Sequence, residues 1–218
     1  GACGGSFLNV CVYRIPLGLS IVSPPSHCPA CKARIRPWEN VPIFSWLLLR
    51  GRCAHCGAPI SPRYILVETA TGLLWAALFL QVLFEGRPLS TLALLLPLVS
   101  LAIPCFLIDC KWRILPNEFT YCIMALGPLF WLAHDLPPFE RAGAFRWEDS
   151  LCLRSILSVA GALLFFWAFA ALGRRAFGRD ALGMGDVKLL AGIAGCLGPF
   201  AMLSILFLGS LTAVACVS

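Results

Sequence analysis

Apolar runs of membrane-spanning length dominate this sequence and limit what it can fold into. A helix needs about 20 apolar residues to cross a bilayer, and the runs at 64–84, 89–108 and 151–173 reach that length. A shorter run at 119–133 is a fourth candidate, and a last apolar block covers 187–217. The chain is only 13% charged, whereas soluble domains carry about 25% charged residues. The sequence therefore predicts an all-α, polytopic integral membrane protein with a transmembrane helix bundle.

Three features of the apolar regions leave their organisation partly open. The pair Gly198-Pro199 falls inside the last block, which is therefore either one kinked helix or two segments. Residues 1–13 look like the end of a spanning helix whose beginning is absent, and the chain stops inside apolar sequence at 213–218. We therefore expect a chain that is truncated at both ends.

Basic residues are concentrated in alternate connections between these runs. Residues 14–63, called the cysteine loop below, contain seven basic residues against Glu39 alone. Connections 109–118 and 174–186 also carry basic residues, whereas 134–150 holds four acidic residues. Basic residues stay on the cytoplasmic side of a membrane, so the three basic connections are predicted to be cytoplasmic. The net charge of +6 follows from this orientation, and no nucleic-acid partner is expected.

Two CxxC pairs lie within the cysteine loop. Cys28 and Cys31 form the first pair, and Cys53 and Cys56 form the second, with 21 residues between the pairs. Each pair presents two thiolates on one tight turn, and two such pairs supply the four ligands of a structural zinc site. The sequence therefore predicts a small zinc-binding loop on the cytoplasmic side.

Other interpretations of these cysteines are weaker. A disulfide or a redox CxxC fits poorly, because the loop is predicted to be cytoplasmic, where disulfides are rare, and no βαβ pattern surrounds it. His27 and His55 adjoin the cysteines and could replace a ligand, although four positions are already filled. The many prolines of the loop favour folding that depends on the metal. No internal repeat is visible.

The remaining eight cysteines are interpreted differently, because they lie in or beside apolar runs. There a cysteine packs as a small hydrophobic residue. These residues are Cys3, Cys11, Cys105, Cys110, Cys122, Cys152, Cys196 and Cys216.

Two aspartates stand at the same predicted edge of the membrane. Asp109 follows the run 89–108, and Asp186 opens the last apolar block. Ionisable groups at such positions are costly and often functional. Two neighbouring carboxylates cannot both ionise easily, so one remains a base while the other keeps its proton. This division suits an aspartyl protease, which activates water and protonates the leaving amine.

Ordinary structural interpretations exist for the same acidic residues. Asp109 could mark the end of a helix, and Asp186 could be an N-cap stabilised by the helix dipole. The glycines Gly183 and Gly185 before it could form a flexible turn. Glu68, a third acidic residue in an apolar run, could have a juxtamembrane or helix-dipole role.

Taken in order, the motifs of this chain resemble those of the type IV prepilin peptidases. The GxGD tetrapeptide is a weak signal alone, but the ordered set covers nearly the whole chain and is specific. The motifs are Gly5-Ser6-Phe7-Leu8-Asn9, His27-Cys28-Pro29-Ala30-Cys31, Trp38-Glu39-Asn40, Leu49-Arg50-Gly51-Arg52-Cys53, Ile108-Asp109 with Leu115-Pro116-Asn117, and Gly183-Met184-Gly185-Asp186.

The resemblance implies a hydrolase of the bacterial inner membrane, with prepilins or pseudopilins of type IV pilus and type II secretion systems as substrates. Its members cut the leader peptide on the cytoplasmic side. It implies that Asp109 and Asp186 are catalytic, and Gly183 and Gly185 would let the substrate backbone approach closely. Asn117 stands where the family often has Asp, and no loss of activity is expected from this difference.

A second activity is also implied by the resemblance. Bifunctional members of the family methylate the new N-terminus with S-adenosyl-L-methionine as cofactor. Gly51 matches a position linked to that methylation, which makes it a candidate for the cofactor site. Two alternatives stay open: a methyltransferase-only or degenerate paralogue, and a non-enzymatic membrane assembly or transport protein with a zinc knuckle.

The predicted organisation has three parts. Residues 1–13 are the end of a first transmembrane helix, and 14–63 are the four-cysteine zinc loop. Residues 64–218 form the transmembrane peptidase region, expected to be incomplete at its C-terminus. The predicted partners are the prepilin substrate and the lipid bilayer.

Overall fold

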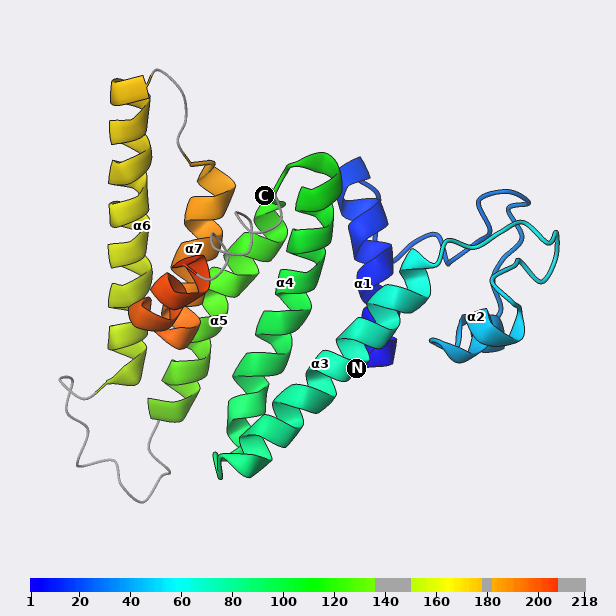
Figure 1. Ribbon diagram of the computed structural model, residues 1–218, viewed down its shortest axis with the longest axis horizontal. Coiled ribbons are helices and arrows are strands. Elements are labelled where there is room, and N and C mark those ends of the chain that lie inside the picture. The colour runs from blue at the N-terminus through cyan, green and yellow to red at the C-terminus, as the bar shows by residue number, and fades with distance from the viewer. Residues whose placement is uncertain (136–149, 178–181, 208–218) are drawn as a thin grey trace. The chain divides into compact units, whose positions relative to one another are not determined.

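A computed structural model of the chain describes residues 1–135, 150–177 and 182–207 (Figure 1). These residues are largely helical, with only isolated β-bridges in the described ranges. The chain divides into two compact units, Gly1–Arg113 and Ile114–Ser218. The predicted all-α fold is confirmed.

Among the described residues, three helices are long and apolar enough to cross a membrane: Arg63–Phe84, Leu89–Trp112 and Leu151–Arg175. They correspond to the runs expected at 64–84, 89–108 and 151–173. The shorter run at 119–133 also forms a helix, which is not one of these three. The finding supports a chain with several membrane-spanning helices.

The first unit is built on helices α1 (Ala2–Arg14), α3 (Arg63–Phe84) and α4 (Leu92–Trp112), which pack against one another. A small residue brings α1 close to α3, since a Cβ added at Gly5 would lie 2.7 Å from the Cα of Glu68. Small residues allow such approaches between membrane helices.

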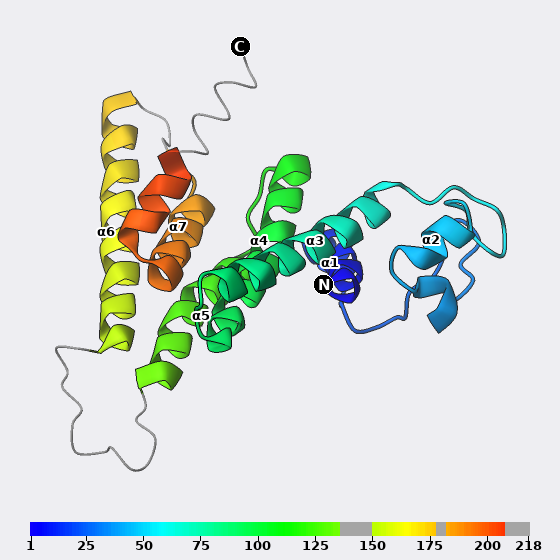
Figure 2. The same cartoon turned by 60° about the horizontal axis from the view of Figure 1, so that its bottom comes forward.

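The cysteine loop connects α1 to α3 and contains η1 (Ile15–Leu17), η2 (Pro37–Asn40) and α2 (Phe44–Leu48). Figures 1 and 2 show α2 to one side of α1 and α3. Three polar side chains hold together the loop and the two helices that it connects. Arg14 donates to the carbonyls of Ser20 (2.8 Å) and Pro24 (2.7 Å).

The other two fastenings involve α3. The Asn9 side chain donates to the carbonyl of Tyr64 at 3.2 Å, which joins α1 to the first turn of α3. Glu68 is buried, and its Oε2 accepts a hydrogen bond from the backbone N–H of Ile43 at 2.8 Å. Glu68 therefore has a specific role that the sequence left open, since it anchors the residue that precedes α2.

The second unit consists of α5 (Asn117–Asp135), α6 (Leu151–Phe177), α7 (Met184–Leu197) and a helical stretch at 199–207. Gly198 has φ 89° and ψ 161°, which ends α7. The last apolar block is therefore divided into two segments within its described residues, and its remainder at 208–217 lies outside them.

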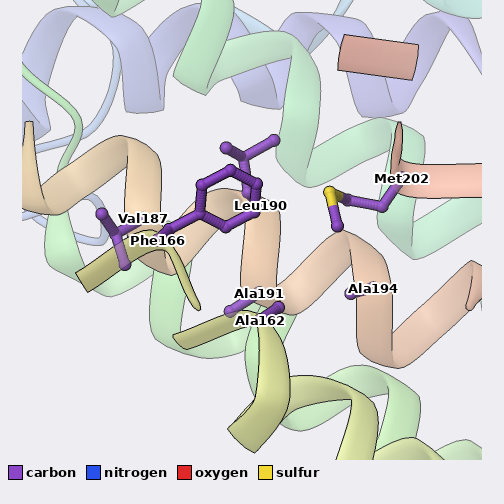
Figure 3. Packing of buried hydrophobic residues seen from close by; sticks show 7 residues of the cluster. All are labelled: Ala162, Phe166, Val187, Leu190, Ala191, Ala194 and Met202. Carbon is purple, nitrogen blue, oxygen red and sulfur yellow. The ribbon is translucent and has the colours of Figure 1, made fainter. Parts of the chain in front are cut away.

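The core of this unit lies where α6 and α7 meet, as Figure 3 shows. Ala162 and Phe166 of α6 pack with residues of α7 and with Met202. Two of the four α7 residues in this contact are alanines, Ala191 and Ala194, and such small residues let helices approach closely. The buried cluster comprises Ala162, Phe166, Val187, Leu190, Ala191, Ala194 and Met202.

Glycines on α7 and α5 bring backbone against backbone. A Cβ added at Gly127 of α5 would lie 2.5 Å from the carbonyl carbon and oxygen of Gly195 in α7. Ser155 of α6 donates to the same Gly195 carbonyl at 2.7 Å. The three helices of the unit therefore meet at Gly195.

The cysteines outside the two CxxC pairs differ in burial. The prediction that they pack as small hydrophobic residues fits Cys11, Cys105 and Cys196, which are buried, and Cys152, which is partly buried. It does not fit Cys3, Cys110 and Cys122, which are exposed. Cys216 lies outside the described residues.

The contact at Gly127 predicts a stability difference between two matched substitutions. We expect Gly127→Val to lower the thermal unfolding temperature, because forcing a side chain into a filled contact costs about 1–3 kcal/mol. Gly161→Val in α6 is the control, since a Cβ there meets nothing within 4 Å. The measurement is thermal unfolding of both variants in the same lipid. Equal melting temperatures would contradict the packing.

Candidate functional site

The four cysteines of the loop converge on one point. The sulfur atoms of Cys28, Cys31, Cys53 and Cys56 all lie within 4.8 Å of one another, and Cys28 Sγ is 3.9 Å from Cys56 Sγ. A zinc ion with Zn–S bonds of about 2.3 Å requires sulfur–sulfur separations of about 3.8 Å. The cluster therefore has the ligand type, number and spacing to hold a tetrahedral metal ion.

The two CxxC pairs share one backbone design. In each pair, the backbone N–H of the first cysteine donates to the carbonyl of the residue five positions later. The backbone N–H of the residue after the second cysteine donates to the carbonyl of the first cysteine. A third bond closes each turn, from Ile35 to the Ser26 carbonyl (3.0 Å) and from Ile60 to the Gly51 carbonyl (2.7 Å). The paired bonds are Cys28 to Ala33 and Lys32 to Cys28, then Cys53 to Ala58 and Gly57 to Cys53.

Residues 26–35 and 51–60 are therefore two copies of one structural unit, which we call the knuckles. No internal repeat was visible in the sequence, but the backbone hydrogen bonds of these two segments do repeat. The missed signal was the alanine and isoleucine that follow each CxxC at the same offsets: Ala33 and Ile35 in the first knuckle, Ala58 and Ile60 in the second.

Backbone N–H groups prepare the first thiol of each knuckle for metal binding. The N–H groups of Cys31 and Ala30 lower the pKa of Cys28 to about 6. Those of Cys56 and His55 likewise lower the pKa of Cys53. Hydrogen bonds to the charged form of a group favour ionisation, so the first sulfur of each knuckle is readily a thiolate.

The pKa of Cys56 changes in the opposite direction. The Ala58 N–H lowers its pKa, but the neighbouring Cys31, burial and the other two thiols together raise it to about 11. Four thiols this close cannot all ionise without a cation between them, and a bound metal ion deprotonates its coordinating thiols.

The two histidines beside the cysteines make other contacts. His55 Nε2 lies 3.6 Å from Glu39 Oε2, and the same oxygen accepts the N–H of Arg36 at 2.9 Å. His27 Nδ1 lies 3.1 Å from the carbonyl oxygen of Pro25. Neither histidine belongs to the cluster, so the four-cysteine ligand set is the one that the structure supports.

Gly51 is explained by the second knuckle. It is buried with φ 68°, and a Cβ would lie 2.8 Å from Cζ2 of Trp46. The Trp46 indole N–H also donates to the Ile60 carbonyl at 3.4 Å. Glycine is thus required here by backbone conformation and by the ring beside it. Its predicted link to methylation is a separate matter that these contacts do not address.

Each GxGD glycine makes room for a particular neighbour. Gly183 is the N-cap of α7, and Asp186 is the third residue of that helix. A Cβ at Gly183 would lie 3.0 Å from Oδ2 of Asp186, and a Cβ at Gly185 would lie 2.8 Å from Cβ of Leu115. The partly exposed Asp186 carboxylate therefore lies at the positive end of the α7 dipole.

Lys188 joins the GxGD helix to the residues that follow Asp109 in the sequence motif. Its Nζ donates to Asn117 Oδ1 at 2.7 Å and to the hydroxyl of Tyr121 at 3.1 Å. It also lies 4.7 Å from the centre of the Tyr121 ring, within range of a cation–π interaction. No role was predicted for Lys188 from the sequence. Its isolation as the single charged residue in 187–217 was the available signal.

Asp109 lies in the last turn of α4 and is exposed. The helix was expected to end at 108, but it continues to Trp112. Arg113 then adopts a left-handed conformation and donates to the Asp109 carbonyl at 2.9 Å. Asp109 belongs to the first unit and Asp186 to the second, so their pairing remains a prediction.

A cavity of about 350 Å³ lies in the first unit between α1 and the cysteine loop. One face of α1 contributes Cys3, Phe7, Val10 and Arg14 to its wall. Its size is that of a small-ligand site, but its lining includes no acidic residue.

The fold and these sites define a class: helical membrane proteins with a four-cysteine cluster that can hold a metal ion and a helix that begins with the GxGD motif. Residues 1–82 match the bacterial Peptidase A24 N-terminal domain, and residues 95–218 match the type IV leader peptidase family. The chain belongs to the type IV leader peptidase family. The resemblance drawn from the motifs is thereby confirmed.

Curated relatives agree with this assignment. A prepilin leader peptidase/N-methyltransferase of Myxococcus xanthus (strain DK1622) is 39% identical over 97% of this chain, which spans 58% of that relative. Proteins of the same name from Klebsiella pneumoniae and Neisseria gonorrhoeae are 36% and 31% identical, and the chain covers 87% and 76% of them. No solved structure matches this chain.

The cysteine cluster predicts a metal content that depends on the knuckles. We expect about one zinc ion per wild-type chain and almost none in Cys28→Ser or Cys53→Ser, because either change removes one of four ligands. Cys110→Ser is the control, since Cys110 is exposed and outside the cluster. The measurement is elemental analysis of the purified proteins. Full zinc content in both knuckle variants would exclude the cluster as the site.

Proposed function

We propose that this chain is an aspartyl endopeptidase of the membrane that removes the leader peptide from type IV prepilins or pseudopilins. The observation that carries the proposal is the match of both halves of the chain to one peptidase family. The names of the relatives supply the substrate class, because they are prepilin leader peptidases.

In the proposed reaction Asp109 and Asp186 act on one water molecule. The ionised carboxylate takes a proton from the water, whose oxygen attacks the scissile carbonyl carbon. The protonated carboxylate then gives its proton to the departing amine, which breaks the peptide bond.

Packing within the second unit supports this pairing. Leu115 and Asn117, from the motif that begins at Asp109, contact Gly185 and Lys188 next to Asp186. Only five residues of chain lie between Asp109 and Leu115, and an extended chain covers at most about 3.6 Å per residue. The short connection favours a role for both aspartates in one site.

Zinc has a structural role in this proposal. Cys28, Cys31, Cys53 and Cys56 would hold it, and it would supply folding energy to a loop with few other means of stabilisation. The Glu68–Ile43 hydrogen bond would then connect the folded loop to α3. No step of the peptidase reaction involves this ion.

We propose a location in the bacterial inner membrane, with the cysteine loop and both aspartates on the cytoplasmic side. The seven basic residues of the loop support this orientation. The loop leaves α1 at Arg14 and enters α3 at Arg63, so basic residues stand at both of its junctions with helices.

A second activity, N-methylation of the new terminus, is proposed on the names of the relatives, which are also N-methyltransferases. S-adenosyl-L-methionine would supply the methyl group. The cavity beside α1 fits this cofactor poorly, because its lining offers no carboxylate to the ribose hydroxyls or the ammonium group. We therefore assign no residue to the transfer, and Gly51 remains only a candidate.

The proposed mechanism predicts the behaviour of the two aspartates. We expect Asp109→Asn and Asp186→Asn each to lower the cleavage rate by about 10²–10⁴-fold, the usual contribution of a general acid or base. Glu118→Gln is the matched control, since Glu118 is an exposed acidic residue in the first turn of α5. The assay follows cleavage of a prepilin by the protein reconstituted in lipid.

Mass measurement of the cleaved product separates the alternatives. A product that is heavier by one methyl group when S-adenosyl-L-methionine is present establishes the second activity. Cleavage that survives in either aspartate variant would contradict the aspartyl mechanism. Methylation of a pre-cut substrate without any cleavage by the wild type would favour the methyltransferase-only alternative.

The contact between Lys188 and Asn117 predicts a coupled effect on catalysis. We expect Lys188→Met and Asn117→Ala each to lower kcat about 10-fold, and the double variant to lose little more, because contacting residues are not additive. Asn117→Asp should retain activity, since a carboxylate also accepts from Lys188. Cleavage kinetics of the four proteins test this, and fully additive losses would refute the coupling.

A further inference from the structure

The short helix α2 has two different sides. Phe44, Leu47 and Leu48 share one side through their i, i+3 and i+4 spacing, and they are 66%, 56% and 82% exposed. Trp46 instead lies against Gly51 and donates to the Ile60 carbonyl. The second knuckle thus holds α2 by one side, and the other presents apolar side chains outside the membrane-spanning helices.

Two exposed arginines, Arg50 and Arg52, follow α2 directly. Together with Phe44, Leu47 and Leu48 they form what we call the α2 patch. The cysteine loop holds a single acidic residue, Glu39, and its Oε2 is already bonded to the Arg36 N–H and near His55. The patch therefore combines apolar side chains with uncompensated positive charge.

Hydrogen bonding places the start of α2 beside the end of a helix that can span the bilayer. Ile43, which precedes α2, donates to Glu68 at 2.8 Å. Glu68 is only five residues after Arg63, where α3 begins, and five helical residues rise about 8 Å. Since α3 is long and apolar enough to cross a membrane, α2 is held at the level of the membrane–water boundary.

We propose that the α2 patch lies on the anionic headgroup surface of the bilayer. Phe44, Leu47 and Leu48 enter the boundary between headgroups and acyl chains, while Arg50 and Arg52 bind lipid phosphates. Apolar residues beside arginines are the composition that binds such surfaces, and anionic lipids attract basic residues next to a membrane helix. The zinc-bound knuckle would then be held against the membrane at α2 as well as at α1 and α3.

The test is amide hydrogen exchange of residues 44–52 in the whole chain, reconstituted in nanodiscs. Discs of phosphatidylcholine alone are compared with discs containing 30% phosphatidylglycerol, at low and high salt. We expect exchange to slow several-fold in the anionic discs, with the protection reduced by salt because ions screen exposed charges.

Variants separate the patch from the rest of the loop. Phe44→Ser with Leu48→Ser, and Arg50→Gln with Arg52→Gln, should each remove the protection while zinc content stays at the wild-type level. Val22→Ser is the matched control, because Val22 is 84% exposed in the same loop but outside the patch, and it should leave the protection intact.

Two results would overturn the proposal. One is exchange at the same rate in neutral and anionic discs, at either salt concentration. The other is protection that appears only when a prepilin peptide is added, since the patch would then bind protein and not lipid. If both patch variants contain less zinc than the wild type, their exchange rates are set aside. The exchange of the wild-type protein in neutral and anionic discs, at low and high salt, then decides for or against lipid binding.

Discussion

The bilayer gives backbone N–H and C=O groups no partner except one another, and the rest of this structure depends on that constraint. Within lipid only helices satisfy it here, so association between helices relies on close packing and on a few polar contacts. Gly195 illustrates both means. Its missing side chain makes room for Val159 of α6, its backbone packs against Gly127 of α5, and its carbonyl accepts the Ser155 hydroxyl of α6.

Polar side chains serve a different purpose at the ends of the helices. The side chains of Arg14, Asn9 and Glu68 are all buried, and each forms a hydrogen bond with a backbone group of another segment. A buried polar group without a partner is costly, so these contacts are specific as well as stabilising. Arg14 and Glu68 connect the cysteine loop, which is irregular in structure, to regular helices, and Asn9 connects α1 to α3.

Much of the fold could be predicted from spacing alone. The apolar runs located α3, α4 and α6 to within a few residues, and the two CxxC pairs located the four-cysteine cluster, because each depends on neighbours in the sequence. The end of α4 was placed too early, since the polar residues after Asp109 suggested a boundary although they are compatible with a helix. Arg113, in a left-handed conformation, ends it instead.

Contacts between residues far apart in the chain could not be predicted from the spacing of residue types. Lys188 reaches Asn117 across 71 positions, and Glu68 reaches Ile43 across 25. A pattern shows which residue types occur, but not which side chain meets a given backbone group. The same limit hid the specific neighbours of Gly183 and Gly185, for which the sequence suggested only flexibility or access for a substrate.

The two knuckles share one left-handed turn but place different residues in it. Equivalent positions are occupied by Lys32, with φ 60°, and by Gly57, with φ 70°. A left-handed conformation costs a residue with a side chain about 1–2 kcal/mol, whereas glycine adopts it freely. Gly57 therefore makes this turn without strain, whereas Lys32 makes it at a conformational cost and places an exposed positive charge on the first knuckle.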